Sequence, residues 1–459
     1  MEKALEHAKE NFPKFMDKLK ELVKIPSVSF DGFPPEKVED SANAVAQLLK
    51  EEGLENIEIL KIPGAHPYVY GDWLHAPGKP TLLLYAHHDV QPPGRVELWK
   101  TPPFEPTTVG DRLFGRGAAD DKAGIIVHTS AIASYLKTEG KLPLNVKIII
   151  EGEEETGSAH LEQFLEAYQS KLQADCLVLT DTANFDVGVP TITTSLRGLI
   201  STDITVKVMD HPLHSGMWGG PGPDPVIALS KILSKLVDDE GRIAIPGIYD
   251  SVRPLTEAEQ KHVEELGYTE VDFRKQSGLL DSSAILGGPE NPQVKMTRLP
   301  SLSVNAIQAS SKKDVSNIVN ESAWCKVGIR TVPDMKGSEV LASLKAFIQE
   351  VAPWGVEITF ENDQLGDWWV TKAEGKAFEI AASALTEAFD QPCVFMGLGG
   401  SIPFVEPFAK VLGGVPALLI GVEDPYTNAH SENESVHIKD LGNSIQGAIR
   451  FYQKYADGK

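Results

Sequence analysis

The sequence predicts an α/β fold, in which a larger domain with a mixed sheet and helices on both faces is interrupted by a smaller α+β domain. Continuous apolar runs separated by helical stretches are typical of strands buried in an α/β sheet. Four such runs occur, at 81–86, 146–150, 176–180 and 416–421. Between the third and the fourth run, from about residue 193, the pattern changes to the alternation of apolar and polar residues that is typical of half-exposed strands. We therefore predict a larger domain in two segments, 1–192 and 372–459, around an inserted domain at 193–371.

Apolar spacing and stop signals predict the helices of the first segment. From residue 5 to 24, apolar side chains recur at helical spacing, and the helix must end before Pro26. A second helix is expected over 38–52, where Gly53 closes it. A third helix, over 122–136, separates the first two apolar runs.

The inserted domain combines alternating strands with amphipathic helices. Alternation predicts its strands, at 193–208, 321–332 and 356–360, and its helices are expected near 224–237 and 338–351. Residues 250–300 follow no clear pattern, and no element is assigned there. A long helix over 372–389 then leads back to the larger domain.

Charge and composition exclude several classes of protein. The 459 residues include 43 Lys or Arg and 65 Asp or Glu, which gives a net charge of −22. A general nucleic-acid binder needs a basic footprint, so this charge argues against one. The three cysteines are scattered and form no CxxC pair, which argues against a disulfide framework or a thiolate zinc site. The N-terminal segment lacks an apolar signal region and no run of about 18 apolar residues occurs, so we expect a cytoplasmic protein without a membrane span.

Polar residues that could bind a ligand follow three of the apolar runs. In open α/β sheets, ligands bind at the carboxyl ends of the strands. His87 and Asp89 follow the first run, at the spacing that places both on one face of a strand. Glu154 and Glu155 belong to a group of four carboxylates after the second run, and Asp181 ends the third. Each segment alone could equally be a solvated polar loop.

Two further segments complete this set. Asp120 and Asp121 precede the helix that begins near residue 122, where they could simply cap its N-terminus. His430 follows the fourth apolar run. His88 lies beside the first candidate ligand, but its side chain should point to the opposite face of the strand, so we expect a structural role. Together the strand ends supply imidazoles and carboxylates without cysteine, a donor set that suits Zn²⁺, with Mn²⁺ or Co²⁺ possible.

In combination and in this order, the motifs H-x-D, G-R-G-x-x-D-D-K, E-x-x-E-E-x-G-S, a strand-end Asp and A-H-S-x-N-E resemble the carnosinase/aminoacylase/acetylornithine-deacetylase family of co-catalytic dinuclear zinc hydrolases. The resemblance covers nearly the whole chain and is closest to the cytosolic, carnosinase-like dipeptidase branch. It implies two divalent metal ions per subunit. The implied ligands are His87 and Asp181 for one ion, Glu155 and His430 for the other, and Asp120 as the bridge between them.

The same resemblance implies roles for the residues around the metals. Asp89 would orient the histidine ligand that precedes it, as metal-bound histidines generally require. Glu154 would be the general base that takes a proton from a water bridging the two ions. The peptide bond between Asp120 and Asp121 should be cis.

The inserted domain carries a second set of matching residues. HPLHSGMWGG resembles the segment whose histidine reaches into the partner subunit's active site, so His214 implies a homodimer in which this residue is donated in trans. Arg330 would hold the substrate's terminal carboxylate, and Asn317 would assist in binding the substrate. GLGGSIPF is typical of the dipeptidase-like branch, and its Gly400 and Ser401 would contact the carboxylate end of the substrate. Without the resemblance, these residues would be a solvated histidine, a surface arginine and a glycine-rich turn.

The sequence therefore predicts a metallo-exopeptidase that hydrolyses dipeptides or short peptides with a free C-terminal carboxylate. The alternative on the same fold is an N-acyl-amino-acid amidohydrolase, against which the GGSIP segment argues. A third hypothesis is a non-catalytic metal-binding or scaffold protein, and the presence of every implied ligand and of the base argues against it.

Overall fold

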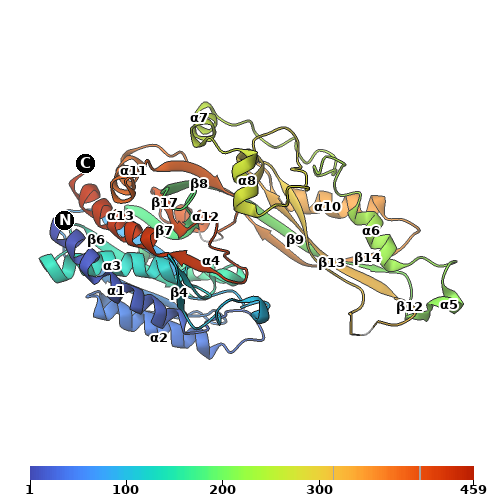
Figure 1. Cartoon of the computed structure of the whole chain (residues 1–459), viewed down its shortest axis with the longest axis horizontal. Coiled ribbons are helices and arrows are strands. Elements are labelled where there is room, and N and C mark those ends of the chain that lie inside the picture. Colours follow the sequence, from blue (N-terminus) through green and yellow to red (C-terminus); the bar gives the residue numbers. More distant parts are fainter. Residues whose placement is uncertain (314, 403–404, 459) are drawn as a thin grey trace. The chain divides into compact units, whose positions relative to one another are not determined.

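The structure, a computed structural model, describes residues 1–313, 315–402 and 405–458 (Figure 1). The chain forms two compact units. The larger unit contains Met1–Thr194, Thr371–Met396 and the segment from Ile402 onward, and the smaller unit contains Ser195–Val370 and Gly397–Ser401. The assignment of dimerisation and lid roles to the inserted domain stays a prediction.

A large mixed sheet forms the centre of the larger unit. Its strands follow the order β1-β2-β6-β3-β7-β17-β8, with β15 and β16 also paired to β8. They are β1 (Glu55–Leu60), β2 (Tyr68–Trp73), β3 (Thr81–His87), β6 (Asn145–Glu151), β7 (Cys176–Ala183), β8 (Thr191–Leu196), β15 (Trp369–Val370), β16 (Val394–Leu398) and β17 (Ala417–Glu423). The four predicted apolar runs are β3, β6, β7 and β17, which pair in parallel at the centre of the sheet.

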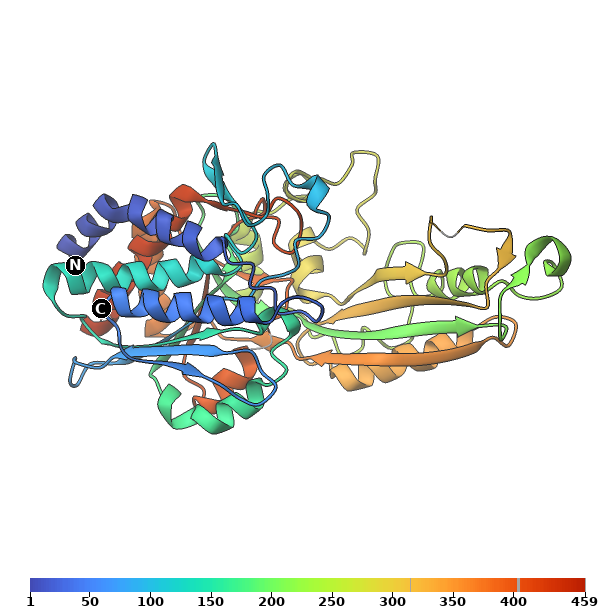
Figure 2. The ribbon, with the colours of Figure 1, turned by 90° about the horizontal axis from the view of Figure 1, so that it is seen from below.

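Helices cover both faces of this sheet. On one face lie α1 (Glu2–Val23), α2 (Glu36–Glu51), α3 (Lys122–Glu139), α11 (Lys376–Phe389) and α13 (Ile438–Asp457), and α4 (Leu161–Leu172) and α12 (Val405–Val411) cover the other (Figure 2). α3 is buried without interruption from Lys122 to Tyr135. Such a helix is buried on all sides because other helices and the sheet surround it. The predicted α/β fold with a mixed sheet is confirmed.

A small three-stranded sheet joins the two sequence segments of the larger unit. β18 (Ser435–His437) pairs with β5 (Arg112–Phe114), which pairs with β4 (Thr107–Val109). The short 3₁₀ helices η1 (Val96–Leu98) and η2 (Glu154–Thr156) lie in nearby loops of the sequence. Through β18, the segment after His430 is hydrogen-bonded to the segment before Asp120.

The smaller unit is built on a four-stranded antiparallel sheet, in the order β11-β13-β9-β14. These strands are β11 (Ser301–Gln308), β13 (Ser322–Thr331), β9 (Gly198–Lys207) and β14 (Glu357–Gly366), and α6 (Pro225–Leu233) and α10 (Gly337–Val351) pack against it. A second, two-stranded sheet pairs β10 (Leu213–His214) with β12 (Ile318–Val319), next to α5 (Ser215–Trp218). The alternating pattern thus predicted β9, β13 and β14 of this sheet, whereas no strand was predicted at the position of β11.

Three short helices lie in the region to which the sequence analysis assigned no element. They are α7 (Glu257–Leu266), α8 (Glu270–Ser277) and α9 (Pro292–Arg298). α7 and α8 each begin with a capping box, at Thr256 with Glu259 and at Thr269 with Asp272. No described helix combines the length and the apolar character that crossing a membrane requires.

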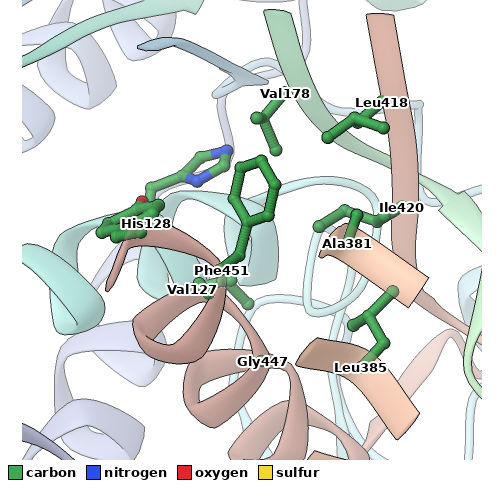
Figure 3. Close-up of a pocket in the computed structure, with 11 residues that line it drawn as sticks. Val127, His128, Val178, Ala381, Leu385, Leu418, Ile420, Gly447 and Phe451 are labelled. Carbon is green, nitrogen blue, oxygen red and sulfur yellow. The ribbon is translucent and has the colours of Figure 1, made fainter. Parts of the chain in front are cut away.

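A small apolar cavity lies between helices and strands of the larger unit (Figure 3). Val178 and Leu418 reach it from strands, and Leu385, Gly447 and Phe451 from helices. Its free volume of about 10 Å³ is close to the smallest that holds one water molecule. The cavity is a packing feature of the core, because nonpolar side chains dominate its lining.

Candidate metal centre

The predicted ligands meet in two groups within the larger unit. The first group contains His87, Asp120 and Asp181, and the second contains Asp120, Glu155 and His430. Within each group, one ligand atom per residue lies within 4.8 Å of the others. Four of these five residues lie at the end of a strand of the large sheet or in the segment that follows one. The fifth, Asp120, lies in the loop before α3. A shared edge of a parallel sheet explains why segments so distant in sequence converge.

Distances in the first group join one histidine to two carboxylates. The Nε2 atom of His87 lies 3.0 Å from Oδ1 of Asp120 and 3.8 Å from Oδ1 of Asp181. All three side chains are buried or nearly so. A histidine nitrogen and two carboxylate oxygens at this separation are donors that would suit a zinc ion, which could also bind water or substrate.

The second group repeats this arrangement on the other oxygen of Asp120. Nε2 of His430 lies 3.1 Å from Oδ2 of Asp120 and 3.3 Å from Oε2 of Glu155. Each oxygen of Asp120 therefore belongs to a different group. The peptide bond between Asp120 and Asp121 is cis, as predicted.

Asp89 connects the first ligand to the loop that carries the predicted base. Its Oδ1 lies 3.4 Å from Nδ1 of His87, and the backbone N–H groups of Glu154 and Glu155 donate to its carboxylate at 3.2 and 3.1 Å. The hydroxyl of Ser29 donates to it as well, at 2.7 Å. Asp89 thus orients both the imidazole and the turn that presents the two glutamates.

Two residues that support the ligands did not figure among the sequence predictions. Gln91 donates to both oxygens of Glu155, from its backbone at 3.0 Å and from its side-chain amide at 2.6 Å. The carboxylate of Glu434 accepts from the N–H groups of Ala119 and Asp120 at 3.0 and 3.2 Å. Gln91 was two residues beyond the H-x-D motif, and Glu434 was the last letter of A-H-S-x-N-E. Only their spatial neighbours reveal their roles.

Glu434 also forms a buried ion pair. Nη1 of Arg116 lies 2.7 Å from Oε2 of Glu434, and the two side chains are 1% and 0% exposed. Arg116 further donates to the carbonyl of Ser431 at 3.0 Å. The pair therefore fastens the loop that carries Asp120 to the loop that carries His430.

Electrostatics at the site favour the binding of cations. Burial, together with the charges of Asp181 and Asp120, raises the pKa of Glu154 and of Glu155 well above the usual value. For His87, burial alone would lower the pKa, but hydrogen bonds with three aspartates raise it well above its usual value. The surplus of buried negative charge fits divalent metal ions, which would neutralise it.

His88 takes no part in either group. Its Nε2 lies 3.0 Å from the carbonyl oxygen of Pro67, and burial is the main cause that lowers its pKa to about 4. The side chain lies against Gly152, where an added Cβ would approach Nε2 to 2.9 Å. This placement fits the structural role expected from its position in the strand.

In the smaller unit, His214 and Asn317 lie side by side. His214 pairs with Ile318 between β10 and β12, and the N–H of Ser215 donates to the carbonyl of Asn317 at 2.9 Å. The N–H of Gly216 donates to Nδ1 of His214 at 3.1 Å. A neutral His214 therefore carries its proton on Nε2 and presents a hydrogen-bond donor.

Arg330 and the turn at Gly400 and Ser401 also meet in the smaller unit. Nη1 of Arg330 donates to the hydroxyl of Ser401 at 2.7 Å, and Arg197 donates through its backbone N–H to the carbonyl of Gly400 at 3.1 Å. Arg197 was not among the predicted site residues. Its position at the break between β8 and β9 explains this, because the sequence pattern predicted one continuous strand there.

A histidine–carboxylate centre at the carboxyl edge of an α/β sheet, with the half-buried Glu154 next to it, defines the class of metal-dependent hydrolases. Comparison with known proteins identifies the family. The model of peptidase family M20/M25/M40 matches residues 83–454, and the chain belongs to this family. The protein is therefore a metallopeptidase.

The similar proteins include several dipeptidases. The Cys-Gly metallodipeptidase of Schizosaccharomyces pombe is 32% identical over 454 residues, which cover 95% of this chain and 94% of that protein. Human Beta-Ala-His dipeptidase is 28% identical and covers 98% of this chain and 91% of its own length. The crystal structure of human carnosine dipeptidase 1 matches with a TM-score of 0.90 and 26% identity, over 99% of this chain and 98% of that chain. The resemblance inferred from the motifs is confirmed.

Proposed function

We propose that the protein hydrolyses the peptide bond of dipeptides that carry a free C-terminal carboxylate. In this proposal it uses two zinc ions, one bound by each of its two ligand groups. The observation that carries the proposal is the division of Asp120, whose two oxygens each face a separate histidine. The names of its relatives, a Cys-Gly metallodipeptidase and a Beta-Ala-His dipeptidase, support the substrate class. They do not favour the alternative, an N-acyl-amino-acid amidohydrolase.

In this proposal Glu154 moves the protons. When bound, the metal ions would lower the pKa of water and polarise the scissile carbonyl. Glu154 accepts a proton from the attacking water and delivers it to the amine that leaves. Asp89 supports this step because it holds the N–H of Glu154 and thereby fixes the turn from which the carboxylate projects.

The smaller unit is proposed to recognise the substrate and to stabilise the oxyanion. Arg330 receives the terminal carboxylate, with Gly400 and Ser401 in the same subsite and Asn317 assisting near His214. His214 donates the hydrogen bond of Nε2 to the oxyanion, which corresponds to about 10²–10³ in turnover for such a donor. The bond from Gly216 to Nδ1 supports this role, since it leaves the proton on the nitrogen that must donate.

We propose that the protein acts as a homodimer, with His214 donated to the partner's active site. One edge of the smaller sheet supports an association between copies. β11 has no charged residue in Ser301–Gln308, and Val304 and Ile307 are 43% and 55% exposed. The opposite edge, β14, carries Glu357, Glu361 and Asp363, and charges of this kind protect an edge against pairing. The cytoplasmic location stays a prediction.

The decisive experiment compares substrates and metals on one preparation. The apoenzyme, made with a chelator, is reconstituted with Zn²⁺ or Mn²⁺ and assayed on a dipeptide panel beside N-acetylated amino acids. We expect hydrolysis of dipeptides that requires metal and saturates at two ions per chain. Full activity without metal, one ion at saturation, or faster turnover of the acetylated amino acids would each contradict the proposal.

A further inference from the structure

Gln91 binds both oxygens of the carboxylate of Glu155, a candidate ligand of the second group. Its backbone N–H donates to Oε1 at 3.0 Å, and its side-chain amide donates to Oε2 at 2.6 Å. The side chain of Glu155 is 1% exposed, so water has little access to the carboxylate. If the amide were lost, water would not readily take its place, and the carboxylate would be free to turn about its last bond.

The amide of Gln91 and the second metal ion would use the same oxygen of Glu155. Oε2 also faces Nε2 of His430, at 3.3 Å, and Glu155 and His430 are the two residues that the second group does not share with the first. A carboxylate oxygen has two lone pairs, and the amide of Gln91 occupies one of them on Oε2. The other lone pair remains available for an ion of the second group.

Gln91 is itself fixed on both sides along the chain. Before it, the N–H of Val90 donates to the carbonyl of Ser27 at 3.0 Å. After it, the carbonyl of Pro92 accepts from Nη2 of Arg116 at 3.1 Å. Because a proline follows, the backbone of Gln91 is also restricted to extended conformations. The amide is therefore presented to Glu155 from a well-defined position.

The hydrogen bonds of Gln91 belong to the second group. In the part of the chain that the structure describes, its N–H and its amide donate to Glu155 and to no ligand of the first group. Asp89, two residues earlier, supports both groups, because it contacts the ring of His87 and the N–H of Glu155. Gln91 therefore offers a way to change the second group without the first.

We propose that Gln91 is a positioning residue, which orients Glu155 and thereby sets the affinity of the second metal position without acting on the first. The proposal rests on the function proposed above, since that function supplies the two ions. Hydrogen-bond partners of metal ligands change metal affinity by about 10–100-fold. A neutral amide suits this role, because it orients the carboxylate and leaves its negative charge for the cation.

The test measures zinc binding to the apoprotein by calorimetry, in competition with a chelator. Gln91→Met keeps the length of the side chain but removes the amide donor. We expect two zinc ions to bind still, with one dissociation constant raised about 10–100-fold and the other within about twofold of the original. Gln47→Met is the matched control and should change neither constant, because the amide of Gln47 also donates to a carboxylate, that of Glu51 at 2.8 Å, but on the exposed surface of α2.

Two ligand variants assign the constants to the two groups. Asp181→Ala removes a ligand of the first group, so Gln91→Met added to it should weaken the remaining site about 10–100-fold. His430→Ala removes a ligand of the second group, and Gln91→Met added to it should leave the remaining site unchanged. Each protein should keep its melting temperature in the presence of a chelator. Gln91→Asn, whose amide is one methylene shorter, replaces Gln91→Met if that variant does not fold.

The outcomes separate this proposal from the proposed function. Equal weakening of both sites by Gln91→Met, or an unchanged second site, would overturn the positioning role. Hydrolysis of dipeptides by the original protein is measured separately, and zinc binding is measured without substrate. Absence of hydrolysis would therefore refute the proposed function and leave the positioning role intact, whereas a single zinc ion at saturation would refute both.

Discussion

Replacement of Glu434 by Gln should destabilise the protein strongly, although Glu434 belongs to neither group of candidate ligands. Its Oε2 accepts from Nη1 of Arg116 and from the N–H of Gly117, at 2.7 and 3.0 Å. Its Oε1 accepts from the N–H groups of Ala119 and Asp120. A glutamine has only one acceptor oxygen, so either orientation of its amide turns an NH₂ group toward two donors.

The size of the effect follows from burial. The side chains of Arg116 and Glu434 are 1% and 0% exposed, so the guanidinium loses its counterion in a place that water does not reach. Breaking such a buried pair from one side costs about 3–5 kcal/mol. Because the same carboxylate holds the N–H of Asp120, we also expect the affinity for Zn²⁺ to fall by about 10–100-fold.

The assay measures unfolding by denaturant in the presence of a chelator, so that loss of metal does not contribute, and zinc binding by calorimetry. Glu432→Gln is the control, since the pair of Glu432 with Arg95 lies two residues away and Arg95 is 69% exposed. This control should leave stability and zinc affinity nearly unchanged. The double variant Arg116→Met with Glu434→Gln should recover part of the loss, because the unpaired charge is gone. A typical hydrogen bond contributes about 1 kcal/mol to the free energy of unfolding. If Glu434→Gln lowered this free energy by less than that, the reasoning from the buried ion pair would be refuted.

Three further predictions concern catalysis, packing and pH. Glu154→Gln and His214→Ala should each be nearly inactive alone, and mixing them should restore activity through hybrid dimers; no recovery on subunit exchange would contradict donation in trans. Gly447→Ala should stabilise the protein by about 0.5–1 kcal/mol, because Gly447 lies inside α13 and alanine favours a helix. The side chain of Leu385, 3.0 Å from the added Cβ, can shift into the adjoining cavity. A lower melting temperature of the variant would show that Leu385 cannot make this shift. His128 has a pKa lowered by burial to about 4, so the unfolded chain takes up its proton first and stability falls as the pH drops from about 6.5 toward 4. Between pH 8 and pH 5, the His128→Gln variant should lose about 2 kcal/mol less free energy of unfolding than the original protein. If the free energies of unfolding of the variant and the original protein ran parallel with pH, the lowered pKa of His128 would be contradicted.

Most of the larger unit could be predicted from the sequence because its central strands are buried on both faces. β3, β6, β7 and β17 are therefore continuous apolar runs. β1 has mostly exposed side chains, so its sequence, ENIEIL, lacks such a run. Its pairing with β2 depends on contacts that the pattern does not contain.

The break between β8 and β9 was not predictable from alternation alone. The pattern continues across Arg197 and Gly198, and only the neighbours of Gly198 show why a glycine begins β9. A Cβ there would lie 2.3 Å from Oγ1 of Thr331 and 2.6 Å from the carbonyl oxygen of Gly366. Backbone crowding of this kind involves residues more than a hundred positions away in sequence, which a local pattern does not record.

For the candidate site, residue type and position after a strand indicated where ligands could gather, but the assignment of His87, Asp181 and Glu155 as ligands depended on the resemblance to a known family. The supporting residues were harder to select. Gln91 and Glu434 act through hydrogen bonds to ligands or to their backbone, and many chemically equivalent residues elsewhere in the chain do neither. Their roles depend on three-dimensional neighbours.

The discontinuous larger unit has a consequence for how the protein is synthesised. β7 precedes the smaller unit in the chain, whereas its parallel partner β17 follows it. During translation, the ribosome must synthesise the smaller unit before β17, so one edge of β7 remains unpaired in the meantime. Unpaired strand edges of this kind favour aggregation. The second ligand group is incomplete until His430 has left the ribosome.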